Sequence, residues 1–181
     1  MERSYFLGGN TPQGFVSFYG DIVDNYKLKK FYILKGGSGL GKSTFMKKFA
    51  ERILEKFPTT DVDYVYCSQE PTSLDAVIFP VLGVGVMDGT NPHMVDPKYP
   101  GIVDAIVDLG KHIDEGKIKP HFAELKQIIA TKKMHYKEAY KHLALAKSEH
   151  DKVENAYVEC VGWAGVDADF ERVVGEVMGV I

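Results

Sequence analysis

One short segment of the chain, residues 36–44, has the residue types and spacing that hold a polyphosphate. It reads Gly-Gly-Ser-Gly-Leu-Gly-Lys-Ser-Thr, a complete match to the pattern G-x-x-x-x-G-K-[ST]. Glycines lack a Cβ, so successive backbone N–H groups can turn inward and form an anion-binding nest. The segment therefore predicts binding of a nucleoside triphosphate.

Three side chains of this segment have specific expected roles. Lys42 should reach the β- and γ-phosphate oxygens, and the Ser43 hydroxyl should coordinate Mg²⁺. Thr44 is expected to cap the loop and to contact the α-phosphate. The predicted nucleotide-binding set comprises Gly36, Gly37, Ser38, Gly39, Leu40, Gly41, Lys42, Ser43 and Thr44.

The flanking residues predict the elements that position this loop. Residues 31–35, Phe-Tyr-Ile-Leu-Lys, are typical of a short strand. After the loop, apolar residues recur at helical spacing on one face, namely Phe45, Met46, Phe49, Ile53 and Phe57. A strand, a glycine loop and a helix follow in order, and the helix N-terminus adds unpaired N–H donors for an anion.

Polar residues follow a second predicted strand, residues 62–67. In parallel α/β sheets ligands gather at the carboxyl ends of the strands, so Gln69 and Glu70 are candidates to orient a water or a substrate hydroxyl, with Glu70 as the catalytic choice. The alternative is a polar turn before a helix capped by Ser73.

Asp88 is the predicted second ligand of Mg²⁺. Pro80, Gly83 and Gly85 divide residues 76–87 into short segments, and the last of these is mostly apolar and ends at Asp88. A buried strand with a terminal carboxylate is the usual partner of a phosphate loop. A plain strand that meets an Asp-Gly turn has the same pattern, and Asp96 is the reserve candidate.

The remaining periodicities predict helices. Apolar spacing favours one helix within residues 15–26 and another within 102–113. Residues 121–160 contain no glycine or proline and carry a seven-residue apolar repeat interrupted at Lys132 and His150. This helix would reach about 60 Å, unless it breaks near Lys132, and a last helix opens at Asp167. Only three or four strands are expected, all before Asp88.

These elements predict an α/β protein with a three-layer core of the P-loop NTPase type and a small parallel sheet, followed by a helical, coiled-coil-like part. We expect a nucleotide-binding core over residues 1–100. We expect residues 101–181 to form a helical region that is a truncated or inserted part of the same domain. The apolar stripes at 120–160 and in the last helix predict a homo-oligomer or a partner helix.

Composition and charge indicate which partners and which cellular location the protein has. The 181 residues carry a net charge of −3, which does not favour a nucleic-acid partner. Charge is uneven, because residues 117–152 hold nine lysines against four acidic residues, the pattern of a solvated helix face or of a site for an acidic partner. Two distant cysteines and the lack of a leader or an apolar span predict a cytoplasmic protein without membrane contact.

Several motifs together resemble a poorly characterised bacterial ATPase-like family whose members carry two phosphate-loop halves in tandem. The likeness covers residues from about Tyr5 to Gly110, and this chain carries one such loop and corresponds to the first half. The resemblance implies nucleotide binding and nucleotide-kinase-like relatives. The motifs that carry it are Phe6-Leu7-Gly8-Gly9-Asn10-Thr11 with Gly14-Phe15, residues 34–44, Asp88-Gly89-Thr90, Pro92-His93 and Asp96-Pro97.

Three functions remain open from the residues. The first is slow, Mg²⁺-dependent hydrolysis of a nucleoside triphosphate, with ATP favoured because a guanine-reading Asn-Lys-x-Asp is absent. The second is transfer of the γ-phosphoryl group to a small molecule or nucleotide, which the scarcity of arginine (Arg3, Arg52 and Arg172) disfavours. The third is a non-catalytic interaction module gated by nucleotide.

Overall fold

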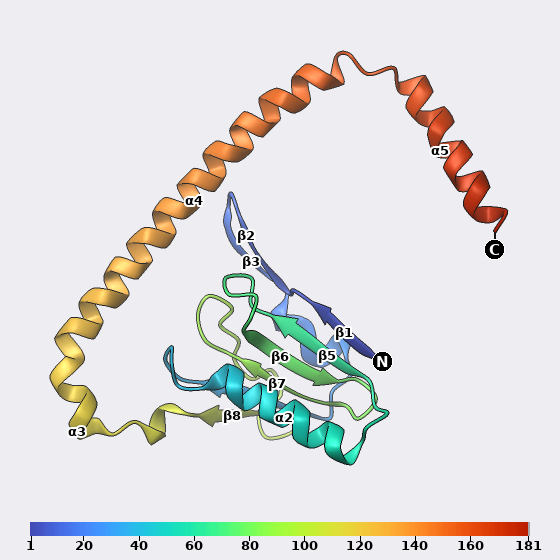
Figure 1. Ribbon diagram of the computed structural model, residues 1–181. Helices are drawn as coiled ribbons and strands as arrows, with labels where there is room; N and C mark the ends of the chain where they lie inside the picture. The colour runs from blue at the N-terminus through green and yellow to red at the C-terminus, as the bar shows by residue number, and fades with distance from the viewer. Residues whose placement is uncertain (181) are drawn as a thin grey trace.

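A mixed six-stranded sheet lies at the centre of the computed structural model, which describes residues 1–180 (Figure 1). The protein is thus an α/β protein with two long C-terminal helices. Its strands are β1 (Glu2–Tyr5), β2 (Gly8–Thr11), β3 (Gly14–Ser17), β4 (Lys30–Lys35), β5 (Val62–Tyr66), β6 (Leu74–Phe79), β7 (Val84–Asp88) and β8 (Asp104–Asp108). Its main helices are α2 (Lys42–Lys56), α4 (Phe122–Val158) and α5 (Trp163–Met178).

The sheet has the strand order β1-β5-β6-β7-β4-β8. β1 and β5 are parallel, and β4 is parallel to both β7 and β8. β6 is antiparallel to β5 and to β7. Five strands therefore end at one edge of the sheet, where β6 begins. The predicted small parallel sheet is thus a mixed sheet of six strands, most of which are parallel.

β6 accounts for the antiparallel pairs. All six of its residues are buried, and residues 80–83 join it to β7 by a short turn that antiparallel pairing allows. Gly83 has φ +68° in this turn, a conformation that glycine adopts readily. The predicted helix after Ser73 is therefore wrong, because a strand begins at Leu74.

β8 contradicts the predicted helix within residues 102–113. Asp104–Asp108 pairs in parallel register with β4, so that Ile33 lies opposite Ile106 and Leu34 opposite Val107. The β-branched residues Ile106 and Val107 fit this pleated edge, and pairing with β4 overrides the helical spacing of the neighbouring apolar residues. The sheet consequently extends beyond residue 100, and the expectation that all strands precede Asp88 was also wrong.

The N-terminal prediction of a helix within residues 15–26 holds only in its second half. β3 pairs with β2 as an antiparallel hairpin, and Gly14, with φ +111°, permits the tight turn between them. A 3₁₀ turn, η1 (Tyr19–Asp21), and the short α1 (Ile22–Asn25) follow. They bury Tyr19 and Ile22 against the sheet.

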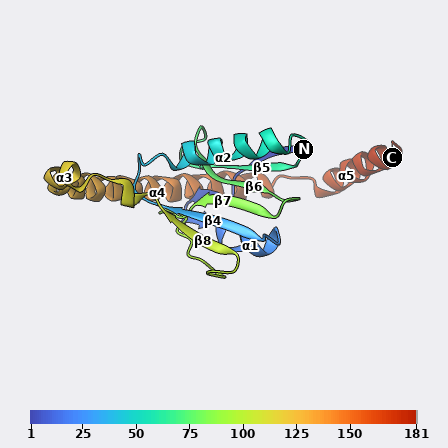
Figure 2. The same cartoon turned by 90° about the horizontal axis from the view of Figure 1, so that it is seen from below.

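Two apolar clusters pack the sheet against α2 on one face and against the η1–α1 segment on the other (Figure 2). On one face, Met46 and Ala50 of α2 pack with Leu34 of β4. On the other face, the η1–α1 segment packs against Ile33. β4 therefore contributes to both clusters through alternate residues, as a central strand does.

The C-terminal helices extend beyond this core. α3 (Glu115–Ile118) and a 3₁₀ turn, η3 (Lys119–His121), lead into α4, which runs for 37 residues without a break at Lys132. α5 begins at Trp163, before the predicted start at Asp167. No residue of α4 or α5 is buried within the described part of the chain. None of the helices in residues 1–180 combines the length and apolar character needed to cross a membrane.

Candidate functional site

The predicted phosphate segment lies between β4 and α2, as the sequence indicated. We call residues 36–41 the glycine-rich loop. Gly39 and Gly41 have φ values of +85° and +77°, in the left-handed region that L side chains rarely adopt. Gly41 is also the residue that precedes the first turn of α2. The loop therefore presents backbone and few side chains next to the unpaired N–H groups of a 15-residue helix.

Lys42 is the charged group beneath this loop. Its side chain is only 9% exposed, and its Nζ donates hydrogen bonds to the carbonyl oxygens of Gly36 and Gly37, both at 2.9 Å. The same Nζ lies 3.5 Å from Oδ2 of Asp88. The ammonium group is thus held by oxygen atoms on two sides, at the position from which it could bind phosphate oxygens instead.

Asp88 lies beside Lys42 because of strand register. It is the last residue of β7 and pairs with Leu34 of β4, so both side chains point to the face covered by α2. Its Oδ1 accepts hydrogen bonds from the backbone N–H of Thr90, at 2.9 Å, and from the Thr90 hydroxyl. These bonds orient Oδ2 toward Lys42. The structure therefore brings these two predicted residues together.

Ser43 and Thr44 lie in the first turn of α2, and Ser43 contacts the start of β6. The Ser43 hydroxyl oxygen accepts a hydrogen bond of 3.0 Å from the backbone N–H of Leu74. Its proton is still available for donation. Thr44 is exposed, as are Gly37 and Ser38 of the loop, whereas Leu40 is partly covered.

The donor set at this edge suits a hard cation. Ser43 supplies a hydroxyl oxygen and Asp88 a carboxylate, the oxygen ligands that Mg²⁺ prefers. Within residues 1–180 no three His, Cys, Asp or Glu side chains gather as a metal site. A Mg²⁺ ion held here would therefore need oxygens from a phosphate and from water as its other ligands, which is its usual coordination beside nucleotides.

The two residues predicted to orient a water are engaged elsewhere. Oε1 of Glu70 accepts hydrogen bonds from the hydroxyl and the backbone N–H of Thr72, at 2.6 and 3.4 Å. These bonds hold the pKa of the Glu70 carboxyl below its usual value, which weakens it as a base. Oε1 of Gln69 accepts a hydrogen bond of 2.8 Å from the Tyr136 hydroxyl of α4.

Asp96, the reserve metal candidate, anchors the segment that follows Asp88. Its carboxylate lies 3.1 Å from Nζ of Lys35 and is 81% exposed. Lys35 Nζ also donates to the carbonyl oxygens of Gly89 and Val95, at 2.8 and 2.7 Å. Lys35, at the end of β4, thus fixes the polypeptide on the carboxyl side of Asp88.

The structure adds a buried polar cluster that the sequence reasoning missed. The Tyr19 hydroxyl donates to Oδ2 of Asp75 at 2.8 Å, and Nε2 of His93 lies 3.6 Å from Oδ1 of the same carboxylate. The His93 ring stacks on Tyr19, with centroids 4.7 Å apart. Burial raises the pKa of Asp75, although His93 opposes the shift. One carboxylate in the otherwise apolar run Leu74–Phe79 was the available signal.

Asp75 reaches this cluster through a β-bulge. Val65 pairs with Ala76 and Tyr66 pairs with Leu74, so Asp75 has no cross-strand partner on β5. A bulge re-aims the side chain of the extra residue. Since Ala76 pairs with Met87, Asp75 lies next to the end of β7 and to Asp88.

We expect Asp75→Asn to become progressively more stabilising, relative to the natural chain, as the pH rises above about 4, the ordinary pKa of an aspartate. Folding raises the pKa of Asp75, so its contribution is favourable below its unfolded pKa and is lost as the pH passes the folded value. Asparagine stays neutral and can still accept the Tyr19 hydrogen bond. Urea unfolding at several pH values measures the difference.

Asp61→Asn is the control for this titration. Asp61 is exposed, and the N-terminal amine lowers its pKa, so the sign of its small pH trend should be opposite. A stability difference for Asp75→Asn that is constant or shrinks with rising pH would contradict the assignment.

The three arginines make ion pairs outside the glycine-rich loop. Arg3 binds the buried carboxylate of Asp63 through two nitrogens, at 2.7 and 2.8 Å. Arg52 pairs with Glu55, and Arg172 on α5 pairs with two acidic residues of its own helix.

Comparison of the chain with protein-family models, curated proteins and solved structures gave no match.

Proposed function

We propose that the protein binds a nucleoside triphosphate with Mg²⁺, most simply ATP, and hydrolyses it slowly. The observation that carries this proposal is the placement of Lys42, buried under the glycine-rich loop within 3.5 Å of Asp88. A buried ammonium group that faces open backbone and a helix N-terminus is suited to an anion. The complete sequence motif supports the same ligand.

Binding would exchange the partners of Lys42. In the structure the ammonium group is satisfied by the carbonyl oxygens of Gly36 and Gly37. Phosphate oxygens carry more charge than carbonyl oxygens and form stronger hydrogen bonds with an ammonium group. We therefore expect Lys42 to turn from the loop carbonyls to the polyphosphate, while loop N–H groups bind the same anion.

Ser43 and Asp88 are the residues that would hold Mg²⁺. When bound, the ion would neutralise charge on the β- and γ-phosphate oxygens. The bond from Leu74 N–H orients the Ser43 hydroxyl, and the two bonds from Thr90 orient Asp88. Ser43 is thus held by the backbone of β6, and Asp88 by Thr90 in the turn that follows β7.

We expect slow turnover because, among the described residues, the site has no arginine to stabilise charge on the phosphoryl group and no unoccupied side chain of Gln69 or Glu70 to orient a water. None of the three arginines forms a contact with the loop, so no guanidinium stands ready to stabilise charge on a transferring phosphoryl group. Glu70 and Gln69 are occupied by Thr72 and Tyr136. A nucleotide kinase needs guanidinium groups for a second set of phosphates, so hydrolysis is favoured over transfer.

Incubation with γ-labelled ATP and Mg²⁺, alone and with a panel of nucleotide and small-molecule acceptors, tests this proposal. We expect label to appear as free phosphate, at a rate that falls when Mg²⁺ is chelated. Label on an acceptor would establish a kinase instead. Absence of both heat and thermal stabilisation in calorimetry with saturating MgATP or MgGTP would refute nucleotide binding itself.

A second candidate function, a module gated by nucleotide, is favoured by a chain of contacts from α2 to α4. Ser43 holds Leu74, and Nζ of Lys47 donates to the Thr72 carbonyl oxygen at 3.1 Å. The loop that contains Thr72 meets α4 through the Gln69–Tyr136 bond. A change at the start of α2 can therefore be transmitted to α4.

Tyr136→Phe should uncouple α4 from the nucleotide. We expect MgATP to change the hydrogen exchange of residues 68–73 and of neighbouring α4 amides in the natural chain, because Tyr136 joins the two. In the variant the α4 response should be lost, with nucleotide affinity changed less than about threefold, since one exposed hydrogen bond contributes about 1 kcal/mol or less. Tyr157→Phe, on exposed α4 surface, is the control. An unchanged α4 response in Tyr136→Phe would contradict this coupling.

A further inference from the structure

His93 is a buried polar side chain to which the proposed site gives no role. It is 4% exposed, and neither of its ring nitrogens has a hydrogen-bond partner among residues 1–180. Nε2 lies 3.6 Å from Oδ1 of Asp75, which is too far for a hydrogen bond. Because a buried polar atom without a partner costs free energy, a small approach of His93 to Asp75 would be favourable.

The groups around His93 prepare this approach. Its ring stacks on Tyr19, with centroids 4.7 Å apart, and lies beside Phe15, with centroids 6.3 Å apart. The Tyr19 hydroxyl donates to Oδ2 of Asp75 at 2.8 Å, so the carboxylate is already oriented. Its other oxygen, Oδ1, is the one near Nε2, so a shorter distance between these two atoms would give a hydrogen bond.

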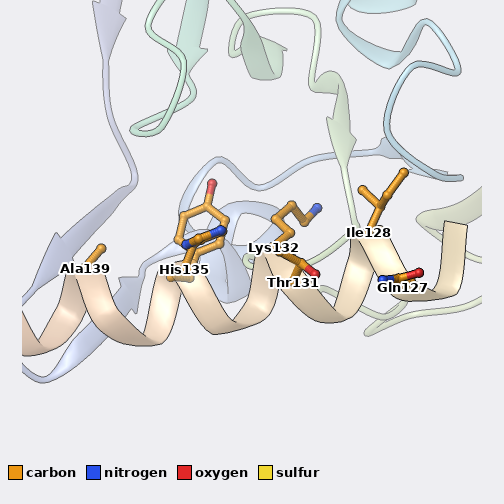
Figure 3. Close-up of a pocket in the computed structure, with 7 residues that line it drawn as sticks. Gln127, Ile128, Thr131, Lys132, His135 and Ala139 are labelled. Atoms are coloured by element: carbon orange, nitrogen blue, oxygen red, sulfur yellow. The ribbon is translucent and has the colours of Figure 1, made fainter. Parts of the chain in front are cut away.

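The His93 cluster is a stronger candidate for a functional role than the open groove along α4. A cavity of about 630 Å³ lies there, but its lining residues, all within 127–139, extend from this one helix (Figure 3). Binding sites usually bring together polar groups that converge on one point. The side chains of His93, Asp75 and Tyr19 converge in this way, because they come from the residues after β7, from β6 and from η1.

Residues 89–96, which follow β7 directly and which we call the exit segment, carry both His93 and the residue that holds Asp88. The backbone N–H of Thr90 donates to Oδ1 of Asp88 at 2.9 Å, and the Thr90 hydroxyl donates to the same oxygen. Nζ of Lys35 donates to two carbonyl oxygens of the exit segment, at 2.8 and 2.7 Å. His93 is the buried side chain of this segment, so its contact with the sheet affects how Asp88 is held.

Two adjacent residues at the start of β6 connect to both proposed ligands of Mg²⁺. The backbone N–H of Leu74 donates to the Ser43 hydroxyl oxygen at 3.0 Å. Asp75, the next residue, meets His93 and through it the exit segment. A bond between His93 and Asp75 would therefore fix the exit segment relative to the strand that holds Ser43.

We propose that His93 is a positioning residue for the two Mg²⁺ ligands, and that its Nε2 completes the hydrogen bond to Asp75 when the cation and its nucleotide are bound. This inference rests on the proposed function. To act as a ligand, Oδ2 of Asp88 must change partner, since it lies 3.5 Å from Nζ of Lys42. Thr90 joins Asp88 to the exit segment, and the bond from His93 would hold that segment in the bound arrangement.

Calorimetric titration with ATP, in Mg²⁺ and in EDTA, tests this role in the full chain. His93→Phe keeps an aromatic ring beside Tyr19 but has no N–H donor. Since a hydrogen bond to a carboxylate is a strong one, this variant should bind MgATP about tenfold more weakly than the natural chain. ATP in EDTA should bind to both within about twofold. His93→Gln keeps an N–H donor and should stay within about threefold of the natural MgATP affinity.

Nitrogen NMR of the natural chain, with ¹⁵N-labelled histidine rings, adds a measurement that needs no folded His93→Phe. The His93 signals are those missing from the spectrum of His93→Gln. MgATP should shift the Nε2 signal of His93, because a new hydrogen bond forms there, and ATP in EDTA should leave it nearly unchanged.

Tyr26→Phe is the matched control for loss of a contact with a buried carboxylate. The Tyr26 hydroxyl donates at 2.7 Å to Asp63, which is fully buried near the end of β5 that lies away from Leu74. This variant should lose stability in urea without a change in either affinity.

A natural chain that binds no nucleotide refutes the proposed function, and this inference with it. If the natural chain binds, the inference alone is overturned when His93→Phe keeps the natural MgATP affinity, or loses affinity equally in Mg²⁺ and in EDTA. A His93 signal that does not respond to MgATP overturns it as well.

Discussion

Lys42→Ala should reduce ATP hydrolysis by about 100-fold or more and weaken nucleotide binding, because it removes the ammonium group that lies under the glycine-rich loop. Removal of a single preorganised donor to a developing anion has effects of this order. The substitution also leaves Asp88 without its nearby positive charge. Release of labelled phosphate and calorimetric titration with MgATP measure the two losses.

Lys48→Ala provides the control for this experiment. Lys48 lies on the same helix, two turns from the loop on exposed surface, so its loss changes the net charge equally without changing the site. Both variants should keep the unfolding temperature of the natural chain within a few degrees. Hydrolysis by Lys42→Ala at the rate of Lys48→Ala would remove Lys42 from the proposed site.

Phe79→Ala should lower the free energy of unfolding by about 3–5 kcal/mol, the cost of removing a fully buried phenyl ring. Phe79 is the last residue of β6 and is completely buried. Its ring meets Phe49 of α2 edge-on, with centroids 6.0 Å apart. The substitution leaves a cavity between the sheet and the helix that follows the glycine-rich loop. Urea unfolding followed by circular dichroism measures the change.

Phe57→Ala is the matched substitution at the surface. Phe57 follows the last residue of α2 and is 39% exposed, so its removal should cost about 1 kcal/mol or less. If the two variants lose equal stability, the packing of α2 on β6 is not as described.

The local elements of the fold were predictable, and the non-local pairings were not. β4 and α2 begin and end within a residue or two of the predicted bounds, because strand propensity, glycine turn and helical spacing all act within a few residues. β8 was mistaken for a helix because Ile106 and Val107 are specified by β4, more than 70 residues earlier in the chain. Apolar periodicity in one segment cannot report such a partner.

In the candidate site, too, the residues that local motifs specify were predictable, whereas contacts between distant segments were not. Lys42 and Asp88 were predicted separately and lie together, since carboxyl ends of parallel strands share one edge. The assignment of their roles remains a prediction. The engagement of Glu70 by Thr72 and the cluster around Asp75 depend on a loop contact and a bulge, which leave little trace in the sequence. The unbroken α4 follows directly from the absence of glycine and proline in residues 121–160.

The position of β4 in the sheet has a consequence for synthesis of the chain. Both of its neighbours, β7 and β8, lie later in the sequence, so during translation this strand emerges long before either edge can be covered. The hairpin of β6 and β7 needs only adjacent residues and can form within microseconds of leaving the ribosome. The β8 side of β4 is therefore covered only once Asp108 has emerged, and nascent chains that stall earlier should expose this strand edge to chaperones.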